Sequence, residues 1–234
     1  MIKAILLDCG GVLVCPPTGD WLLGPDYKSI LGESFVPEKL EAFRKARRAY
    51  LHLLPDTNLV DTDEVECEMF IPYYERTLGE IGIVLSPEAL QALSRMQVYR
   101  DDRYHLFADV LPTLKRWHGQ YKLGIVSDAP PSTRRIMGTM GVMDYMGGAT
   151  FSCEIGKLKP DAEMYLRTLR QLEVAPQEAV FVDDLSKNLR GAQALGIHAV
   201  QMRRPMPRHF PAFDAWEGPI IEELGQLNAI LQGL

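Results

Sequence analysis

Residues 2–11 read Ile-Lys-Ala-Ile-Leu-Leu-Asp-Cys-Gly-Gly. Apart from Lys3, the run up to Leu7 is apolar and rich in strand-forming residues, and it ends at Asp8 just before a glycine turn. A short apolar run of this kind is typical of a buried strand in a parallel sheet, and such sheets bind ligands at the carboxyl ends of their strands. The stretch therefore predicts a buried strand that delivers the Asp8 carboxylate to a ligand site.

Beyond residue 100, strand-like and helix-like segments alternate. The patterns predict strands over residues 121–126, 149–153, 179–182 and 198–202, and helices over residues 110–117, 132–140, 161–172, 187–195 and 220–231. Strands that alternate with helices of this length favour right-handed β-α-β units. We therefore expect a doubly wound α/β fold with a parallel sheet, similar to a Rossmann fold.

Residues 16–99 follow a different pattern. Apolar residues such as Leu40, Phe43 and Tyr50 recur at helical spacing, and Ser86-Pro87-Glu88 is typical of a helix N-terminus. No convincing strand pattern interrupts this stretch. The sequence thus predicts a core domain of residues 1–15 and 100–234, with a helical domain of residues 16–99 inserted after the first strand.

Composition limits the classes of function and partner. Of the 234 residues, 47% are hydrophobic and 24% are charged, and the formal net charge is −6. These values are ordinary for a soluble globular protein, and the negative charge disfavours a nucleic-acid partner. No apolar stretch is long enough to span a membrane, and Asp8 interrupts the only N-terminal run that resembles a secretory signal.

Four cysteines occur without the Cys-x-x-Cys spacing of a zinc site. Reduced thiols are typical of the cytoplasm, so we expect a cytoplasmic protein. Whether it is a monomer or a homodimer stays open.

Polar residues end three of the expected strands. These are Asp8, the pair Ser127-Asp128 and the pair Asp183-Asp184, while Lys159 directly precedes an expected helix. The ends of parallel strands lie on one edge of a sheet, so these groups can meet. Together they supply a carboxylate nucleophile, a hydroxyl, an ammonium and an acidic metal site, which is the set that phosphoryl transfer requires.

Four motifs resemble those of the haloacid dehalogenase-like (HAD) hydrolase superfamily, in the family's order and approximate spacing. They are Leu7-Asp8-Cys9-Gly10-Gly11-Val12-Leu13, Val126-Ser127-Asp128-Ala129, Lys159-Pro160-Asp161 and Phe181-Val182-Asp183-Asp184. Each motif alone is weak, but the ordered set is specific. The helical insert resembles the family's C1-type cap, so the resemblance covers nearly the whole chain.

The resemblance implies a role for each residue. Asp8 is then the nucleophile, which forms an aspartyl-phosphate, and it ligates Mg²⁺ together with the main-chain carbonyl of Gly10 and with Asp183 and Asp184. Ser127 and Lys159 hold the phosphoryl group, with Asp128 beside them as a substrate-binding residue. The implied substrate is a small phosphorylated metabolite.

The motifs depart from the family's pattern at two positions. Phosphatases of the family usually carry a second aspartate two residues after the nucleophile, which protonates the leaving group, whereas this chain has Gly10. Asp128 replaces a residue that is usually neutral. Two alternatives therefore stay open: a 2-haloacid dehalogenase that uses Asp8 without a metal, and a catalytically impaired binding protein on the same fold.

Three residues of the insert are candidates for a place in or near the site. Asp20 is the nearest acid that could replace the absent aspartate. Trp21 and Tyr27 are aromatic residues that either line the cap side of the pocket or belong to the core of the cap.

Overall fold

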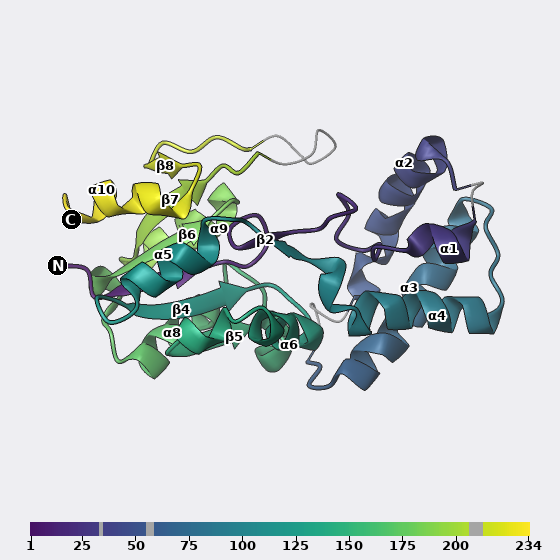
Figure 1. Ribbon diagram of the computed structural model, residues 1–234, viewed down its shortest axis with the longest axis horizontal. Helices are drawn as coiled ribbons and strands as arrows, with labels where there is room; N and C mark the ends of the chain where they lie inside the picture. Colours follow the sequence, from purple (N-terminus) through teal and green to yellow (C-terminus); the bar gives the residue numbers. More distant parts are fainter. Residues whose placement is uncertain (33–34, 55–58, 206–212) are drawn as a thin grey trace.

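The chain forms two parts that lie at opposite ends of an elongated molecule (Figure 1). The structure is a computed structural model, which describes residues 1–32, 35–54, 59–205 and 213–234. A sheet with its flanking helices forms one part, and the helices α1 to α4 form the other. Both chain termini lie at the end of the sheet that is remote from these four helices.

Six parallel strands form the sheet, in the order β5-β4-β1-β6-β7-β8. Their bounds are Ala4–Leu7 (β1), Lys122–Ser127 (β4), Gly148–Phe151 (β5), Ala179–Asp183 (β6), His198–Met202 (β7) and Ile220–Ile221 (β8). The predicted parallel α/β fold is thus confirmed. The first strand lies at the centre of the sheet, between β4 and β6.

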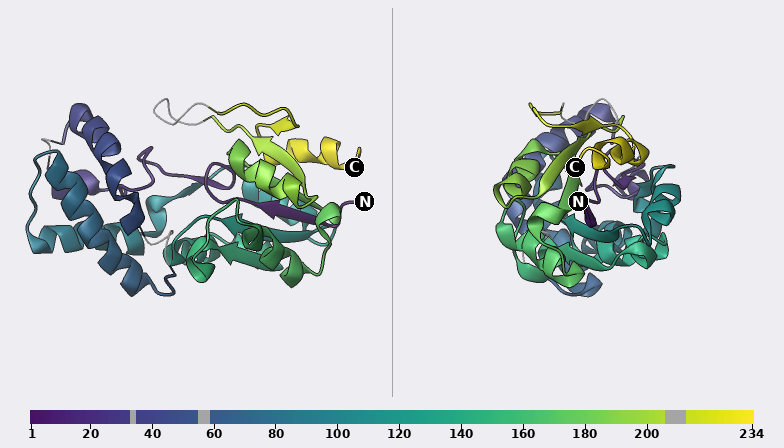
Figure 2. Two further views of the ribbon diagram at one scale, coloured as in Figure 1. Left: turned by 180° about the vertical axis from the view of Figure 1, so that it is seen from behind. Right: turned by 90° about the vertical axis from the view of Figure 1, so that its left-hand side faces the viewer.

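Helices cover both faces of the sheet (Figure 2). The helices of this part are Val110–Trp117 (α5), Pro131–Thr139 (α6), Ser152–Ile155 (α7), Ala162–Leu172 (α8), Ser186–Ala194 (α9) and Leu227–Leu231 (α10). Alternate residues of β1 join different cores: Ile5 and Leu7 pack in the cluster that holds α5 and α6, and Ala4 and Leu6 pack in the cluster that holds α8 and α9. This alternation fixes the strand with Asp8 at its carboxyl end.

The helical unit, as we call α1 to α4 with their connections, has a hydrophobic core of its own. Its helices are Tyr27–Leu31 (α1), Pro37–Ala46 (α2), Asp63–Glu80 (α3) and Pro87–Tyr99 (α4), with a 3₁₀ helix at Arg47–Leu53. The Ser86 hydroxyl accepts a hydrogen bond from the main-chain nitrogen of Ala89, as expected for an N-cap. Tyr27 is buried in this core against Phe35, so it packs the helical unit and does not line a pocket. The domain boundaries after residues 15 and 99 stay a prediction.

Two connections join the helical unit to the sheet. The short strands β2 (Val14–Cys15) and β3 (His105–Leu106) pair in antiparallel fashion, and the sequence analysis predicted neither. A buried contact adds to them, because Glu66 of α3 accepts hydrogen bonds from the main-chain nitrogen and the hydroxyl of Ser132 at 2.8 and 2.7 Å. The helical unit is therefore held against the first turn of α6, close to the ends of the central strands.

The predicted closing helix over residues 220–231 is wrong in its first half. Ile220 and Ile221 form β8, which pairs with β7, and a 3₁₀ helix at Leu224–Gln226 precedes the short α10. A pair of apolar residues fits a strand at the edge of a sheet as well as one face of a helix. Here the residues form a strand because they pair with the edge of β7, which would otherwise have no partner. The predicted strand over residues 149–153 also ends early, since α7 begins at Ser152.

Candidate active site

The candidate site residues lie together at the carboxyl edge of the sheet. Asp8 directly follows β1, Ser127 ends β4, and Asp183 ends β6 with Asp184 next to it. Lys159 lies in the turn that precedes α8. Because β1 lies between β4 and β6, the side chains of Asp8, Ser127 and the acidic pair lie at the ends of three neighbouring strands. This edge of the sheet faces the helical unit (Figure 1).

Lys159 is a buried cation between two carboxylates. Its Nζ lies 2.9 Å from Oδ1 of Asp8 and 2.7 Å from Oδ2 of Asp183. Burial acts to lower the pKa of Lys159, but the charges of Asp183, Asp8 and Asp128 outweigh it and the pKa rises well above its ordinary value. The ammonium therefore stays charged at neutral pH, and it can hold phosphoryl oxygens as well as Asp8.

Asp8 has the environment of an anionic nucleophile. Its Oδ1 accepts a hydrogen bond from the main-chain nitrogen of Cys9 at 2.8 Å. Burial raises the pKa of Asp8 to about 6, and the charge of Asp183 adds to this, whereas Lys159 and the Ser127 hydroxyl lower it by charge and hydrogen bonding. The carboxylate is consequently mostly ionised at neutral pH, which nucleophilic attack requires.

Asp8, Asp183 and Asp184 form an acidic cluster that fits a divalent cation. Each offers a carboxylate oxygen, and these oxygens lie within 4.8 Å of one another. Burial raises the pKa of Asp184 to about 8, and the charges of Asp183 and Asp8 contribute to the shift. Oxygen ligands of this kind suit Mg²⁺, which would remove their mutual repulsion. The ligand role of the Gly10 carbonyl stays a prediction.

Neighbouring residues fix the positions of the acidic pair. The Asn188 side chain donates to both oxygens of Asp183 at 3.2 and 3.1 Å, and the main-chain nitrogen of Leu185 donates to Oδ1 at 2.8 Å. Gly11 has a φ of +69°, and a Cβ at this residue would lie 2.6 Å from Oδ2 of Asp184. Glycine at position 11 therefore leaves the room that Asp184 occupies.

Asp128 is oriented by the turn that carries Lys159. Its Oδ1 accepts a hydrogen bond from the main-chain nitrogen of Lys159 at 2.8 Å. Burial raises the pKa of Asp128, while the charge of Lys159 lowers it. This placement gives the unusual acid a partner, and it was not foreseen from the sequence. A direct contact of Asp128 with substrate stays a prediction.

The indole of Trp21 lies against Gly10, the position at which phosphatases of the family usually carry a second aspartate. A Cβ at Gly10 would lie 3.4 Å from Cη2 and 3.5 Å from Cζ2 of Trp21. Asp20 is buried, with Oδ2 at 2.9 Å from Nε of Arg44 and Oδ1 at 2.6 Å from a guanidinium nitrogen of Arg47. The hypothesis that Asp20 replaces the missing acid is therefore wrong, because both of its oxygens are held by arginines.

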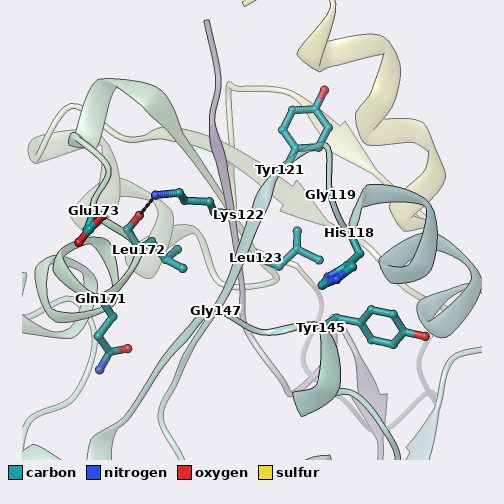
Figure 3. Close-up of a pocket in the computed structure, with 10 residues that line it drawn as sticks. All are labelled: His118, Gly119, Tyr121, Lys122, Leu123, Tyr145, Gly147, Gln171, Leu172 and Glu173. Carbon is teal, nitrogen blue, oxygen red and sulfur yellow. Dashed lines mark hydrogen bonds between the residues drawn. The ribbon is translucent and has the colours of Figure 1, made fainter.

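A separate cavity of about 350 Å³ lies at the opposite edge of the sheet (Figure 3). His118, Tyr121 and Tyr145 line it near the amino ends of β4 and β5, and Lys122 donates to the main-chain carbonyl of Leu172 at 2.5 Å. None of the predicted site residues reaches this cavity. Its lining includes one acid, Glu173, and one lysine, Lys122, but no cluster of acids around an ammonium like the one at the carboxyl edge.

Raised carboxyl pKa values predict how pH and Mg²⁺ change stability. The pKa values of Asp8 and Asp184, about 6 and about 8, lie above the ordinary value of 3.8, so folding favours their protonated forms. That contribution to stability is complete below about pH 4 and is lost as the pH rises to about 8. Mg²⁺ binds the ionised forms, so we expect it to raise the melting temperature more at pH 8 than at pH 5.

Thermal unfolding with Mg²⁺ or with EDTA at both pH values measures this effect. In Asp184→Asn the difference between the two pH values should shrink, because one of the two titrating acids is gone. An equal rise in melting temperature at pH 5 and pH 8 would contradict a metal site built from these acids.

Curated proteins of similar sequence include a phosphatase. The glyceraldehyde 3-phosphate phosphatase of Methanopyrus kandleri is 30% identical over 139 residues, which are 56% of this chain. The aligned region covers 58% of that phosphatase, less than two thirds of its length.

Solved structures that are similar over almost the whole chain include a dehalogenase and a phosphatase. The 2-haloacid dehalogenase from Pseudomonas syringae pv. tomato superimposes with a TM-score of 0.66 at 24% identity, covering 100% of this chain and 99% of that one. The HAD phosphatase from Thermococcus onnurineus has a TM-score of 0.57 at 25% identity, covering 99% of each chain. These likenesses agree with the fold described above.

Within the described part of the chain, no helix combines the length and the apolar character needed to cross a membrane. The family model for haloacid dehalogenase-like hydrolases matches residues 2–196. That match spans all four motifs and the acidic cluster. The chain therefore belongs to the haloacid dehalogenase-like hydrolases.

Proposed function

We propose that the protein is a Mg²⁺-dependent phosphatase that transfers a phosphoryl group from a small phosphorylated metabolite to Asp8 and then to water. The acidic cluster around Lys159 carries this proposal. Two buried carboxylates, Asp8 and Asp183, share the ammonium of Lys159, and the partly buried Asp184 adds a third acid, which leaves an excess of negative charge in a site that excludes much of the solvent. A divalent cation and the substrate's phosphoryl group together complete that charge balance.

Asp8 performs the first step. Its carboxylate oxygen attacks phosphorus, the bond to the ester oxygen breaks, and the leaving group departs with the electron pair. Lys159 and the Ser127 hydroxyl hold the phosphoryl oxygens and keep Asp8 oriented. When bound at the acidic cluster, Mg²⁺ would neutralise charge on the phosphoryl group.

Water completes the reaction. It attacks phosphorus of the aspartyl-phosphate, releases inorganic phosphate and regenerates the Asp8 carboxylate. The proton lost by this water leaves with phosphate or solvent. Such a two-step course is typical of covalent catalysis by a carboxylate.

The helical unit is proposed to act as a cap over this site. Its α3 contacts α6 through Glu66 and Ser132, and the carboxyl edge of the sheet faces it. A cover in this place would exclude water and contact the part of the substrate beyond the phosphate.

Known relatives support hydrolysis but allow two reactions. The name of the Methanopyrus kandleri relative supports a phosphatase, whereas the Pseudomonas syringae neighbour is a 2-haloacid dehalogenase. Dehalogenation needs no proton donor for its leaving group, which agrees with Gly10. The acidic pair Asp183 and Asp184 favours the phosphatase. Displacement of a halide from carbon by Asp8 uses no metal ion, so a dehalogenase would leave the two acids without a cation between them.

Substrate assays with and without metal distinguish the two reactions. We expect hydrolysis of aryl phosphates with Mg²⁺ and none with EDTA, and no halide release from 2-haloacids. Binding of beryllium fluoride that depends on Mg²⁺ reports a competent site even where the physiological substrate is unknown. Halide release in EDTA would replace the proposal by dehalogenation, and absence of both hydrolysis and beryllium fluoride binding would favour a non-catalytic protein.

A further inference from the structure

Gly10 lies two residues after the nucleophile, in the turn that follows β1. Asp8 points at Lys159, and the next residue, Cys9, is buried in the hydrophobic core on the other side. The atoms that a Cβ at Gly10 would meet are Cη2, Cζ2 and Cζ3 of Trp21, at 3.4, 3.5 and 4.0 Å. The outer edge of the indole thus lies against position 10, where the usual second aspartate would stand two residues after the nucleophile.

The segment that carries the indole is anchored at several points. Its ring makes an edge-to-face contact with Tyr104, with ring centroids 5.8 Å apart. The Trp21 carbonyl accepts a hydrogen bond from Nε2 of Gln97 at 2.8 Å, and the Leu22 carbonyl accepts one from the Tyr74 hydroxyl at 2.8 Å. Asp20, on the other side, is held by two arginines. The anchored main chain and the contact with Tyr104 restrict the ring, which therefore needs little ordering when a ligand packs on it.

The absence of an acid at position 10 restricts the leaving group independently. General acid catalysis is typically worth about 10² to 10⁴ in rate. Asp20 does not supply it, since both of its oxygens are engaged by Arg44 and Arg47. An ester is then hydrolysed efficiently only if its leaving oxygen is a weak base that departs without a proton. Phenols meet this requirement and simple alkyl alcohols do not.

We propose that Trp21 selects phosphate monoesters of planar, phenol-like alcohols by packing its indole against the aromatic leaving group. This inference rests on the proposed phosphatase function and adds the substrate class. Gly10 supplies no proton, which requires a weakly basic leaving group, and the indole at Gly10 provides an apolar surface for a flat one. The phosphoryl group passes to Asp8, and the phenolate departs with the electron pair and takes its proton from solvent.

Two esters whose alcohols have similar acidity separate ring recognition from leaving-group chemistry. With Mg²⁺ present, we expect kcat/KM for phenyl phosphate to exceed that for hexafluoroisopropyl phosphate by about 10-fold or more, which is the scale of one aromatic packing contact. Trp21→Leu should remove this preference, and Trp21→Phe should keep most of it. Trp216→Leu is the matched control, because Trp216 packs against the second core cluster and donates to the Pro219 carbonyl.

A binding measurement keeps the test independent of turnover and of folding. Titration calorimetry with phenylphosphonate and cyclohexylphosphonate should show the same preference for the planar ring in the wild type and its loss in Trp21→Leu. Beryllium fluoride binding in the presence of Mg²⁺ should be unchanged in that variant, which shows that its site is intact.

The outcomes distinguish the inference from the function on which it rests. Equal loss of both esters in Trp21→Leu, or no ring preference in a wild type that binds beryllium fluoride, would overturn the role of Trp21 alone. No Mg²⁺-dependent binding of beryllium fluoride or of either phosphonate would overturn the phosphatase function, and the substrate class with it.

Discussion

Asp8→Asn should lower the Mg²⁺-dependent hydrolysis of an aryl phosphate by about 10⁴-fold or more, since removal of a covalent nucleophile is among the most damaging changes an enzyme can undergo. The amide has nearly the shape of the carboxylate, and its oxygen can still accept the hydrogen bond from the main chain of Cys9. It cannot displace the leaving group from phosphorus. Steady-state kinetics with a sensitive product assay measure the loss.

The same variant should fold at least as well as the wild type in the absence of metal. Its substitution removes one anion from a cluster in which burial, with the charges of Asp183 and Asp8, raises the pKa of Asp184 to about 8. Asp144→Asn is the matched control, because Asp144 is an exposed acid on the part of the molecule that contains the sheet. It should keep turnover within about twofold, as surface substitutions usually do. Undiminished turnover in Asp8→Asn, or an equal loss in the control, would remove Asp8 from its proposed role.

Lys159→Met should reduce both turnover and stability. Methionine keeps most of the volume but removes the only ammonium that pairs with Asp8 and Asp183 among the described residues. Breaking a buried ion pair from one side typically costs about 3 to 5 kcal/mol. We expect a loss of this size in the free energy of unfolding near pH 8 in EDTA, and a smaller loss near pH 5, where the carboxylates that remain can take up protons.

Metal and a neighbouring lysine provide the controls for this prediction. Mg²⁺ should restore part of the lost stability, because it neutralises the same acids, but it should not restore turnover. Lys157→Met serves as the matched variant: Lys157 is half exposed and pairs with Asp161 at 3.3 Å, so its loss should cost at most about 1 kcal/mol. Equal unfolding free energies for the two variants in urea titrations would show that Lys159 is not a buried counter-ion.

Patterns that depend on neighbouring residues in the chain predicted most of the fold. The strand at residues 198–202 and the helix at residues 110–117 agree with β7 and α5 in both bounds. In each of these two segments only one hydrophobic periodicity fits, that of a strand or that of a helix, and turn residues bound the segment. The helix predicted over residues 220–231 failed because the pairing of Ile220 with β7 is a contact between distant parts of the chain.

The site divides in the same way. Asp8, Ser127, Lys159 and the acidic pair could be located from the sequence, because each ends a strand or begins a helix and parallel strands share an edge. Asp20 was wrongly considered as the proton donor to the leaving group. The neighbouring sequence does not show that Arg44 and Arg47 fold back onto it. The apolar neighbours of Trp21 gave no signal that its ring would reach Gly10.

By itself, the sequence determined which chemical groups form the site and their order along the chain. They are a carboxylate, a hydroxyl, an ammonium and two acids, each at or next to the end of a regular element. Those positions depend on backbone periodicity and turn residues, which are local properties. Only the tertiary structure decided that Lys159 lies between Asp8 and Asp183, that arginines hold Asp20, and that an indole covers Gly10. These contacts join residues far apart in the chain, and their geometry follows from how the helical unit and the sheet pack together.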